Sequence, residues 1–436
     1  MRARDVGRTF VASRPGREHR PAAHPHTMNP LWRHLPARAV LLLVVLLADA
    51  NPSAAQLANS AWPKHQHDLQ NTGRSSTLSG PIGPSPRILW RYRSRGGERR
   101  AAVTVAPDGT LIVPNGRHPI SGHDPATGAM LWNAKQHGEI WTTIDRSQPA
   151  ISSNGTIYFG ERGNNLWSFT PPGTINWRYK VRADGDVETP PTVGPDGTIY
   201  MASDALSSGW FFAMNPDGSV KWKCITGGAT HNVSPALSPD GETVYVTTGA
   251  RILVAVDTAT GVEIWRTILS PGGTGNRHSN FSPVIAPDGT IYVANLHGVS
   301  AMEPVNGTRL WEARFGSTQF SSPPALGADG TLYVGGTGAP SRFYALDPSD
   351  GSVLWSHRMT DEGRFKNTPA IIDANGNIFV GYATKYYAFD GDGDGAGNSR
   401  VLWTLDIGLV IESGLTLAAD GLLIGGAGRD LVAIGD

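Results

Sequence analysis

Three aspartates alternate with glycines near the C-terminal end of the chain, a spacing that is typical of the start of a calcium-binding loop. Asp390, Asp392 and Asp394 supply carboxylates at the first, third and fifth positions, and Asn398 can add an oxygen at the ninth. The twelfth position is Val401, where such loops carry a bidentate glutamate. The hypothesis is a calcium site formed by the three aspartates and Asn398. The alternative is an acidic surface loop without a metal.

Eight further polar or aromatic residues are candidates for binding a ligand or a partner, because they lie in segments that join one repeated unit to the next. They are Trp141, Arg146, Glu188, His231, Asn232, Arg277, His278 and Asn280. We expect these segments to share one face of the molecule, at the mouth of an axial channel. The alternative is that these residues solvate loops and satisfy backbone groups.

Two of these candidates, His231 and His278, occupy equivalent places in successive units, just ahead of Ser234-Pro235 and Ser282-Pro283. A metal site at these histidines would need a third ligand, which the sequence does not identify.

Motifs for common enzymatic chemistry are absent from the sequence. It contains no Gly-x-Ser-x-Gly elbow, no His-Glu-x-x-His helix, no phosphate-binding loop and no dinucleotide fingerprint. We therefore predict no catalytic residues. Cys224 is the single cysteine, so no intramolecular disulfide can form, and we expect a buried thiol on a strand.

Tight turns punctuate the chain eight times. They are Asp108-Gly109, Asn154-Gly155, Asp196-Gly197, Asp240-Gly241, Asp288-Gly289, Asp329-Gly330, Asn375-Gly376 and Asp420-Gly421. Such pairs tolerate positive φ, and alternating apolar stretches follow them, so each predicts a β-hairpin.

A second hairpin follows in most units, where a glycine precedes a tryptophan by four residues, as Gly261 precedes Trp265. The repeated tryptophans are 42 to 48 residues apart, namely Trp90, Trp132, Trp177, Trp222, Trp265, Trp311, Trp355 and Trp403. We expect each indole to be structural, packed as a wedge between neighbouring sheets.

Two hairpins per unit predict a four-stranded antiparallel sheet, and eight such units predict an all-β, eight-bladed β-propeller. The first strand, residues 87–93, stands before the first turn, and three strands between residues 413 and 434 end the chain. We expect these strands to share one blade, so that the N-terminal strand joins the last blade and closes the ring. The propeller then spans residues 87–436, preceded by a leader segment, residues 56–86.

The N-terminal 55 residues are typical of an export signal. Residues 1–38 are rich in Arg, His and Pro, which predicts disorder, and residues 39–47 form an apolar run that is too short to span a membrane. Met1 and Met28 are both compatible with the start of a signal peptide. We expect an extracytoplasmic protein, periplasmic or secreted, without a membrane span.

The pattern Ala255, Asp257, Thr260, Gly261 and Trp265 resembles the repeat of the PQQ-type propeller family, and residues 62–75 are similar to the leader of its exported members. The resemblance implies two functional branches. Quinoprotein dehydrogenases hold pyrroloquinoline quinone in the central channel, between a tryptophan and a disulfide of adjacent cysteines, over bound calcium. Non-catalytic members resemble the propeller of the outer-membrane β-barrel assembly machine.

The missing cysteine pair and the short chain favour the non-catalytic branch. We expect a monomeric binding or scaffold propeller that recognises a protein or cell-envelope partner and requires no cofactor, with PQQ not expected. The formal net charge is 0, so nucleic acid is not an expected partner. The alternatives are a PQQ-dependent oxidoreductase and a carbohydrate-binding propeller that uses Trp141 and Trp210.

Overall fold

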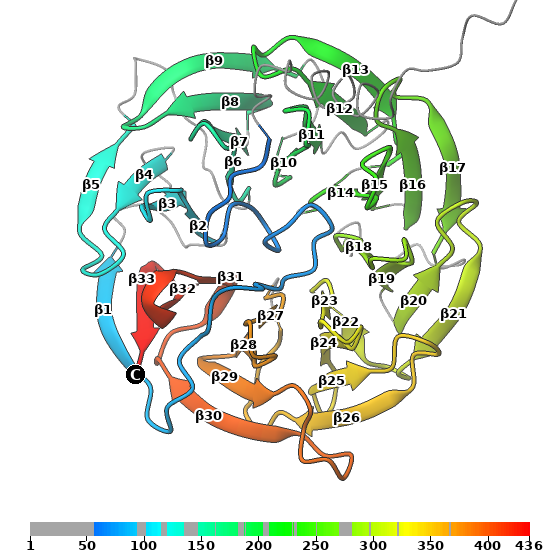
Figure 1. The fold of residues 1–436 in the computed structure, drawn as a ribbon. Helices are drawn as coiled ribbons and strands as arrows, with labels where there is room; N and C mark the ends of the chain where they lie inside the picture. Colours follow the sequence, from blue (N-terminus) through cyan, green and yellow to red (C-terminus); the bar gives the residue numbers. More distant parts are fainter. Residues whose placement is uncertain are drawn as a thin grey trace, which may run out of the picture. The chain divides into compact units, whose positions relative to one another are not determined.

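Eight antiparallel sheets surround one axis in this computed structural model (Figure 1). The structure describes residues 56–93, 102–114, 120–134, 147–161, 163–181, 187, 189–203, 209–228, 230, 233–249, 251–269, 281–295, 298–320, 322–365 and 368–436. The predicted all-β, eight-bladed propeller is confirmed. No helix formed by these residues is long and apolar enough to cross a membrane.

We number the blades in chain order. Blade 1 contains β2 (Thr104–Val105), β3 (Leu111–Pro114), β4 (Ile120–His123) and β5 (Met130–Asn133); blade 2 contains β6 (Ala150–Ile151), β7 (Ile157–Glu161), β8 (Asn165–Thr170) and β9 (Thr174–Lys180); blade 3 contains β10 (Thr192–Val193), β11 (Ile199–Ala202), β12 (Trp210–Met214) and β13 (Val220–Ile225); blade 4 contains β14 (Ala236–Leu237), β15 (Thr243–Thr247), β16 (Ile252–Asp257) and β17 (Glu263–Ile268).

The second half of the ring follows the same plan. Blade 5 contains β18 (Val284–Ile285), β19 (Ile291–Asn295), β20 (Gly298–Met302) and β21 (Arg309–Arg314); blade 6 contains β22 (Gln319–Phe320), β23 (Ala325–Leu326), β24 (Leu332–Thr337), β25 (Arg342–Leu346) and β26 (Val353–Arg358); blade 7 contains β27 (Ile371–Ile372), β28 (Ile378–Tyr382), β29 (Lys385–Asp390) and β30 (Arg400–Asp406); blade 8 contains β31 (Ile411–Leu417), β32 (Leu423–Ala427), β33 (Asp430–Gly435) and, from the N-terminal side, β1 (Arg87–Arg93). The extra strand β22 of blade 6 pairs with β24 and has no counterpart in the sequence repeat.

Blade 8 joins the two ends of the propeller, as the sequence predicts. β1 pairs antiparallel with β33, from Arg87 opposite Gly435 to Arg93 opposite Asp430. The terminal strands therefore supply the sheet that closes the ring and leave no gap between the first blade and the last.

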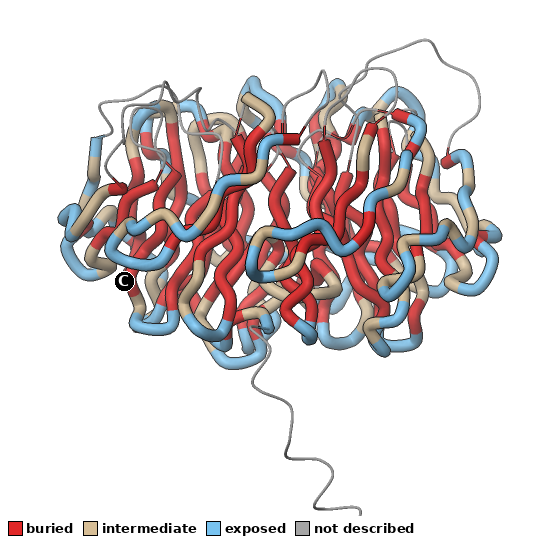
Figure 2. The backbone as a smooth tube through the Cα atoms, turned by 90° about the horizontal axis from the view of Figure 1, so that it is seen from above, coloured by how far each residue is buried: buried red, intermediate tan, exposed pale blue. Residues whose placement is uncertain are grey.

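The tight turns adopt the backbone conformation that their sequence requires. Gly109 has φ 85°, and the backbone N–H of Thr110 donates to a carboxylate oxygen of Asp108 at 3.0 Å. The last turn is tighter, because Asp420 itself has φ 59° inside a 3-10 turn, η1 (Ala419–Gly421). Figure 2 shows exposed turns at the ends of buried strands.

The glycine of each second hairpin receives the tryptophan of the preceding blade. A Cβ atom at Gly261, where φ is 72°, would lie 2.5 Å from the Trp222 ring, so only glycine permits this contact. Seven indole N–H groups donate to carbonyl oxygens outside their own blade at 2.7–3.0 Å: Trp90 to Pro125, Trp177 to Pro216, Trp222 to Thr258, Trp265 to Pro304, Trp311 to Pro348, Trp355 to Gly391 and Trp403 to Pro81. The Gly-x-x-x-Trp spacing is thus an interlock between successive blades.

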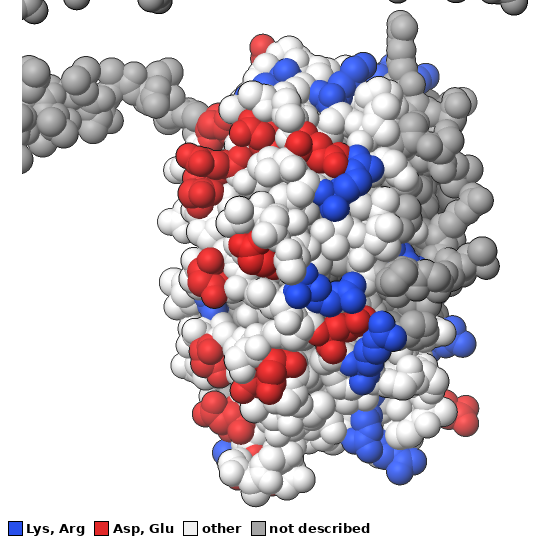
Figure 3. All heavy atoms as spheres, turned by 90° about the vertical axis from the view of Figure 1, so that its right-hand side faces the viewer, with Lys and Arg blue, Asp and Glu red and all other residues white. Residues whose placement is uncertain are grey.

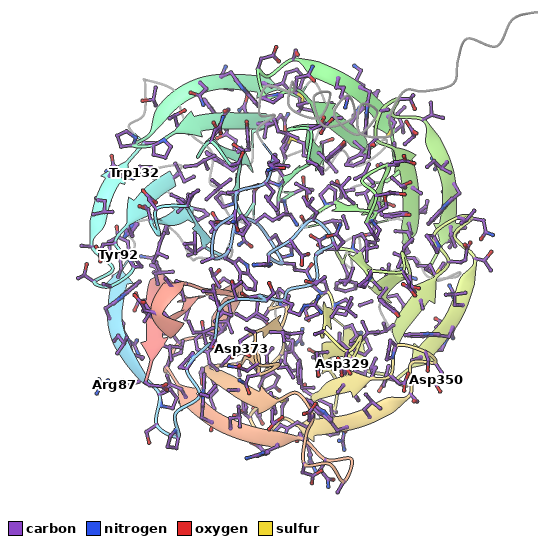
Figure 4. The ribbon with its side chains drawn as sticks, in the orientation of Figure 1. Arg87, Tyr92, Trp132, Asp329, Asp350 and Asp373 are labelled. Atoms are coloured by element: carbon purple, nitrogen blue, oxygen red, sulfur yellow. The ribbon has the colours of Figure 1, made fainter. Side chains whose placement is uncertain are left out.

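Trp132 is the exception among the eight repeated indoles. Its ring lies against Gly122 of its own blade, where a Cβ atom would come within 2.2 Å of the ring, and Gly173 of the next blade meets Ala134 instead. Trp132 lies at the rim in Figure 4.

Acidic and basic side chains lie at different ends of the outer strands on the rim. Figure 3 shows acidic side chains along one edge and basic side chains nearer the middle. Asp217, Asp257 and Glu303 lie in the turns that enter β13, β17 and β21, whereas Arg266 and Arg314 lie on or at the far end of the strands. The turn-bearing face of the propeller is therefore the acidic one, and we call it the turn face.

Replacement of an interlocking indole should destabilise the propeller. We expect Trp265→Ala to lower the free energy of unfolding by about 3–5 kcal/mol, because it leaves a cavity between blades 4 and 5. Thermal melting should show the loss, while Ile264→Ala, which truncates the exposed neighbour, should melt close to the parent. Equal melting of Trp265→Ala and the parent would contradict the interlock.

Candidate functional site

The eight binding candidates chosen from the sequence lie outside the described residues. Trp141, Arg146, Glu188, His231, Asn232, Arg277, His278 and Asn280 therefore stay predictions. The described residues that follow the two histidines lie close together, because the backbone N–H of Ser234 donates to the Ser282 hydroxyl at 2.9 Å. This bond joins the starts of the innermost strands of blades 4 and 5, at the axis and at the face opposite the turn face.

Two of the three carboxylates in the acidic loop of blade 7, those of Asp390 and Asp394, are paired with residues of the same hairpin. Asp394 accepts hydrogen bonds from the backbone and the side-chain amide of Asn398 at 2.9 and 2.8 Å, and these bonds lower its pKa. Asp390 pairs with Arg400 at 3.1 Å. Within the described part of the chain, no three His, Cys, Asp or Glu side chains come together as a metal site. Calcium binding at Asp390, Asp392, Asp394 and Asn398 remains a prediction.

The leader segment, residues 56–86, runs through the centre of the ring and then reaches the rim at β1 (Figure 1). Its start pairs with blade 2, where Leu57 forms an isolated bridge with Ser152. Its end is held by blade 7, where the buried Asp373 carboxylate accepts from the backbone N–H of Gly80 at 3.1 Å (Figure 4). The leader is therefore an integral part of the propeller rather than an appendage.

Six blades donate one equivalent backbone N–H each to leader carbonyl oxygens. The donor is the last residue of the innermost strand, and the distances are 2.8–3.0 Å: Val105 to Trp62, Ile151 to Pro63, Leu237 to Leu69, Ile285 to Gln70, Leu326 to Thr72 and Ile372 to Gly73. Because these donors directly precede the tight turns, the leader crosses the axis at the turn face.

Side chains of the leader complete this axial hub, which we define as residues 62–73. The Asn71 amide donates to the carbonyl oxygens of Ser234 and Pro283 at 3.0 and 3.1 Å, and Gln66 donates to that of Pro324 at 2.9 Å. The fully buried Lys64 ammonium donates to the side-chain oxygen of Asn71 and to two leader carbonyl oxygens. A single polar cluster thus joins the leader to three neighbouring blades.

Burial controls the protonation of the hub. It lowers the pKa of Lys64 to about 7, against the attraction of Asp68. Burial and the neighbouring Lys64 lower the pKa of His65 to about 3, so this imidazole is neutral near pH 7. Burial would raise the pKa of Asp68, but hydrogen bonds from His67 and Thr72 outweigh burial and lower it.

The hydrogen-bond directions also fix the tautomer of His65. The Gln148 amide nitrogen donates to the carbonyl oxygen of Val103 at 2.8 Å, so its amide oxygen faces His65 Nδ1 at 3.1 Å. His65 Nδ1 therefore carries the proton, and its buried Nε2 meets no hydrogen-bond partner among the residues that the structure describes.

This arrangement is suited to holding the chain together rather than to covalent chemistry. In its protonated form, Lys64 has three acceptors for its three ammonium hydrogens, and its side chain is fully buried, away from any substrate. The sequence analysis treats this stretch only as a leader. Its polar residues, which no blade repeats, are the one signal in the sequence for a separate role.

Cys224 and Trp210, two other residues singled out from the sequence, lie in blade 3. Cys224 is on the outer strand β13, and burial raises its pKa to about 11, so its thiol is protonated at neutral pH. Trp210 begins β12 and is half-buried, and the Lys223 ammonium lies 5.1 Å from its ring centre.

Removal of the Asn71 side chain should destabilise the whole ring. We expect Asn71→Ala to lower the free energy of unfolding by about 2–4 kcal/mol, because buried carbonyl oxygens and Lys64 lose their partner. Denaturant titration should show this loss. The matched control, Asn306→Ala in an exposed turn of blade 5, should change stability by less than about 1 kcal/mol, and equal effects of the two variants would refute the hub.

A calcium titration tests the acidic loop. If the loop binds calcium, addition of the ion should raise the melting temperature, and Asp392→Asn should abolish that rise, because Asp392 lies at the third ligand position. Calorimetry without heat, together with a melting temperature that a chelator does not change, would dispose of the calcium hypothesis.

Comparison with known proteins places these features in a family. The family described as outer membrane protein assembly factor BamB matches residues 116–305 and 297–434. BamB of Yersinia pestis is 26% identical over 378 residues, which cover 81% of this chain and 89% of the relative. Tetrathionate hydrolase of Acidithiobacillus ferrooxidans is 22% identical over 454 residues, which cover 87% and 84%.

Solved structures show the same architecture. The quinohemoprotein alcohol dehydrogenase from Comamonas testosteroni superimposes with a TM-score of 0.71 at 13% identity, over 88% of this chain and 82% of that one. At this identity the likeness shows the fold alone. The resemblance to PQQ-type propellers is confirmed: the chain belongs to the PQQ-repeat propeller family described as outer membrane protein assembly factor BamB.

Proposed function

We propose that this chain is an extracytoplasmic, non-catalytic propeller that binds or scaffolds a protein or cell-envelope partner. The observation that carries the proposal is the axial hub. Carbonyl oxygens of residues 62–73 accept hydrogen bonds from six blades at the turn-face ends of the innermost strands, and Asn71 and Gln66 extend toward the other ends of these strands. We infer that a partner approaches the axis from the face opposite the turn face.

We expect the predicted binding residues at the same opposite face. Ser234 and Ser282, which are hydrogen-bonded to each other, stand just before the innermost strands β14 and β18 and a few residues after the positions of His231 and His278. The name of the Yersinia pestis relative, an outer membrane protein assembly factor, favours a partner in the cell envelope.

The chain lacks the adjacent cysteines that the quinone-dependent alternative requires. The resemblance to quinoprotein dehydrogenases implies a disulfide of adjacent cysteines beneath the quinone, and this chain has only Cys224, on the outer strand β13. The residues present therefore do not fit the group as those enzymes hold it, and we derive no redox step for the chain.

Photo-crosslinking in the native envelope tests the binding face. A photo-crosslinking amino acid at position 278 should yield one discrete adduct that mass spectrometry can identify. The same amino acid at position 288, an exposed turn residue on the turn face, serves as the matched control and should yield none. Equal crosslinking from the two positions would contradict a partner on the opposite face.

A dye-linked assay separates the two functional branches. The purified chain, incubated with pyrroloquinoline quinone and calcium, should show no turnover of alcohols or aldoses. Turnover that depends on the quinone would overturn the non-catalytic proposal.

A further inference from the structure

Among the residues that the structure describes, two buried oxygen atoms in blade 2 have no hydrogen-bond donor. They are Oε2 of Glu161, at the end of β7, and Oδ1 of Asn165, at the start of β8. Both residues are buried, with 3% and 8% of their surfaces exposed, and they stand directly opposite each other in the β7–β8 ladder. Buried acceptors without donors are costly, so this pair requires an explanation.

The rest of the two side chains is already paired. The Asn165 amide nitrogen donates to Oε1 of Glu161 and, at 2.9 Å, to the carbonyl oxygen of Gly163. These two bonds use both amide hydrogens of Asn165, so its oxygen must face a donor. An ionised Glu161 offers none, because a carboxylate only accepts.

We infer that Glu161 is a proton-binding site: its carboxyl group is neutral in the folded protein and forms a two-bond ring with the Asn165 amide. One N–H donates from Asn165 to Oε1, and the carboxyl O–H on Oε2 donates to Oδ1. A single proton thus gives both Oε2 of Glu161 and Oδ1 of Asn165 a hydrogen-bond partner, and no other ligand is required.

The surroundings favour the neutral acid. On the same face of this ladder, the nearest pair is Phe159 and Trp167, two residues away from Glu161 and Asn165. Both belong to the apolar cluster that contains Ile112 and Ile120 of blade 1, so an apolar blade contact lies beside the pair. Burial raises the pKa of Glu161 to about 7, and the neighbouring N–H groups of Asn165 and Trp167 oppose the rise without reversing it.

Among the described residues, the causes of this shift in pKa are burial and the neighbouring Asn165 and Trp167, and none of them is a charged side chain. A described cation on the neighbouring strand β9, Arg178, lies over the Trp167 ring, with its guanidinium carbon 5.3 Å from the ring centre.

The sign of the pH effect follows from this shift. The unfolded chain releases the Glu161 proton near the ordinary value of 4.5, whereas the folded chain holds it to about 7. The folded state therefore binds the additional proton between these two values, and stability falls as pH rises through this window. Above about pH 7, an unpaired charge lies between blades 1 and 2 near the face opposite the turn face.

Glu161→Gln tests the inference, because its amide can make both bonds of the ring at any pH. We expect the variant and the parent to melt alike at about pH 5 and the variant to melt at least about 2 °C higher at about pH 8. The control, Glu242→Gln in an exposed turn, should follow the parent at both values. A variant that melts below the parent at about pH 8 would show that the ionised carboxylate is the native form.

Infrared difference spectroscopy provides a readout that does not depend on melting. The parent at about pH 6 should show the carbonyl stretch of a protonated carboxylic acid, which disappears at about pH 8.5 and is absent from Glu161→Gln. Absence of that band from the parent would overturn the assignment. A calcium-induced rise in melting that requires Glu161 would also overturn it, because a cation rather than a proton would then satisfy the two oxygens.

Discussion

The propeller depends on one set of hydrogen bonds at its axis. The innermost strand of a blade has a free edge toward the axis, and a buried backbone N–H on that edge needs an acceptor. In six blades the acceptor is a carbonyl oxygen of residues 62–73, at 2.8–3.0 Å. The chain therefore satisfies the inner edge of its own ring with its leader and closes the rim with the next strand, β1.

At the rim, the structural requirement is to fill the space between blades. Blades diverge as they extend outward, and the Gly-x-x-x-Trp spacing fills the widening gap with an indole that bonds a carbonyl oxygen of the next blade, as Trp265 does with Pro304. The leader contributes here too, because Pro81 accepts the bond from Trp403 that an outer hairpin accepts elsewhere. One segment thus stabilises both the axis and the closing blade, which explains why the leader and β1 are continuous.

The sequence predicts what is local and repeated. Asp-Gly turns and glycine-tryptophan pairs act within about ten residues, so blade number, strand pairing and ring closure follow from them. The path of the leader depends on contacts between distant residues, such as Asn71 and Ser234, which are 163 residues apart. No periodic pattern in the sequence predicts such contacts. No sequence pattern indicates the role of Glu161 either, because that role depends on its burial beside Asn165 and not on its being a glutamate. The strand β22 likewise depends on tertiary context, whereas the bonds of the acidic loop, such as that of Asp394 with Asn398, are local.

Amide hydrogen exchange of the native protein tests the axial account most directly. If the leader satisfies the inner edges, the backbone amides of Val105, Ile151, Leu237, Ile285, Leu326 and Ile372 should exchange only through global unfolding, all at one common and slow rate. Rapid exchange of these six amides, while the second strands of the same blades stay protected, would show that the axis is open and would contradict the account.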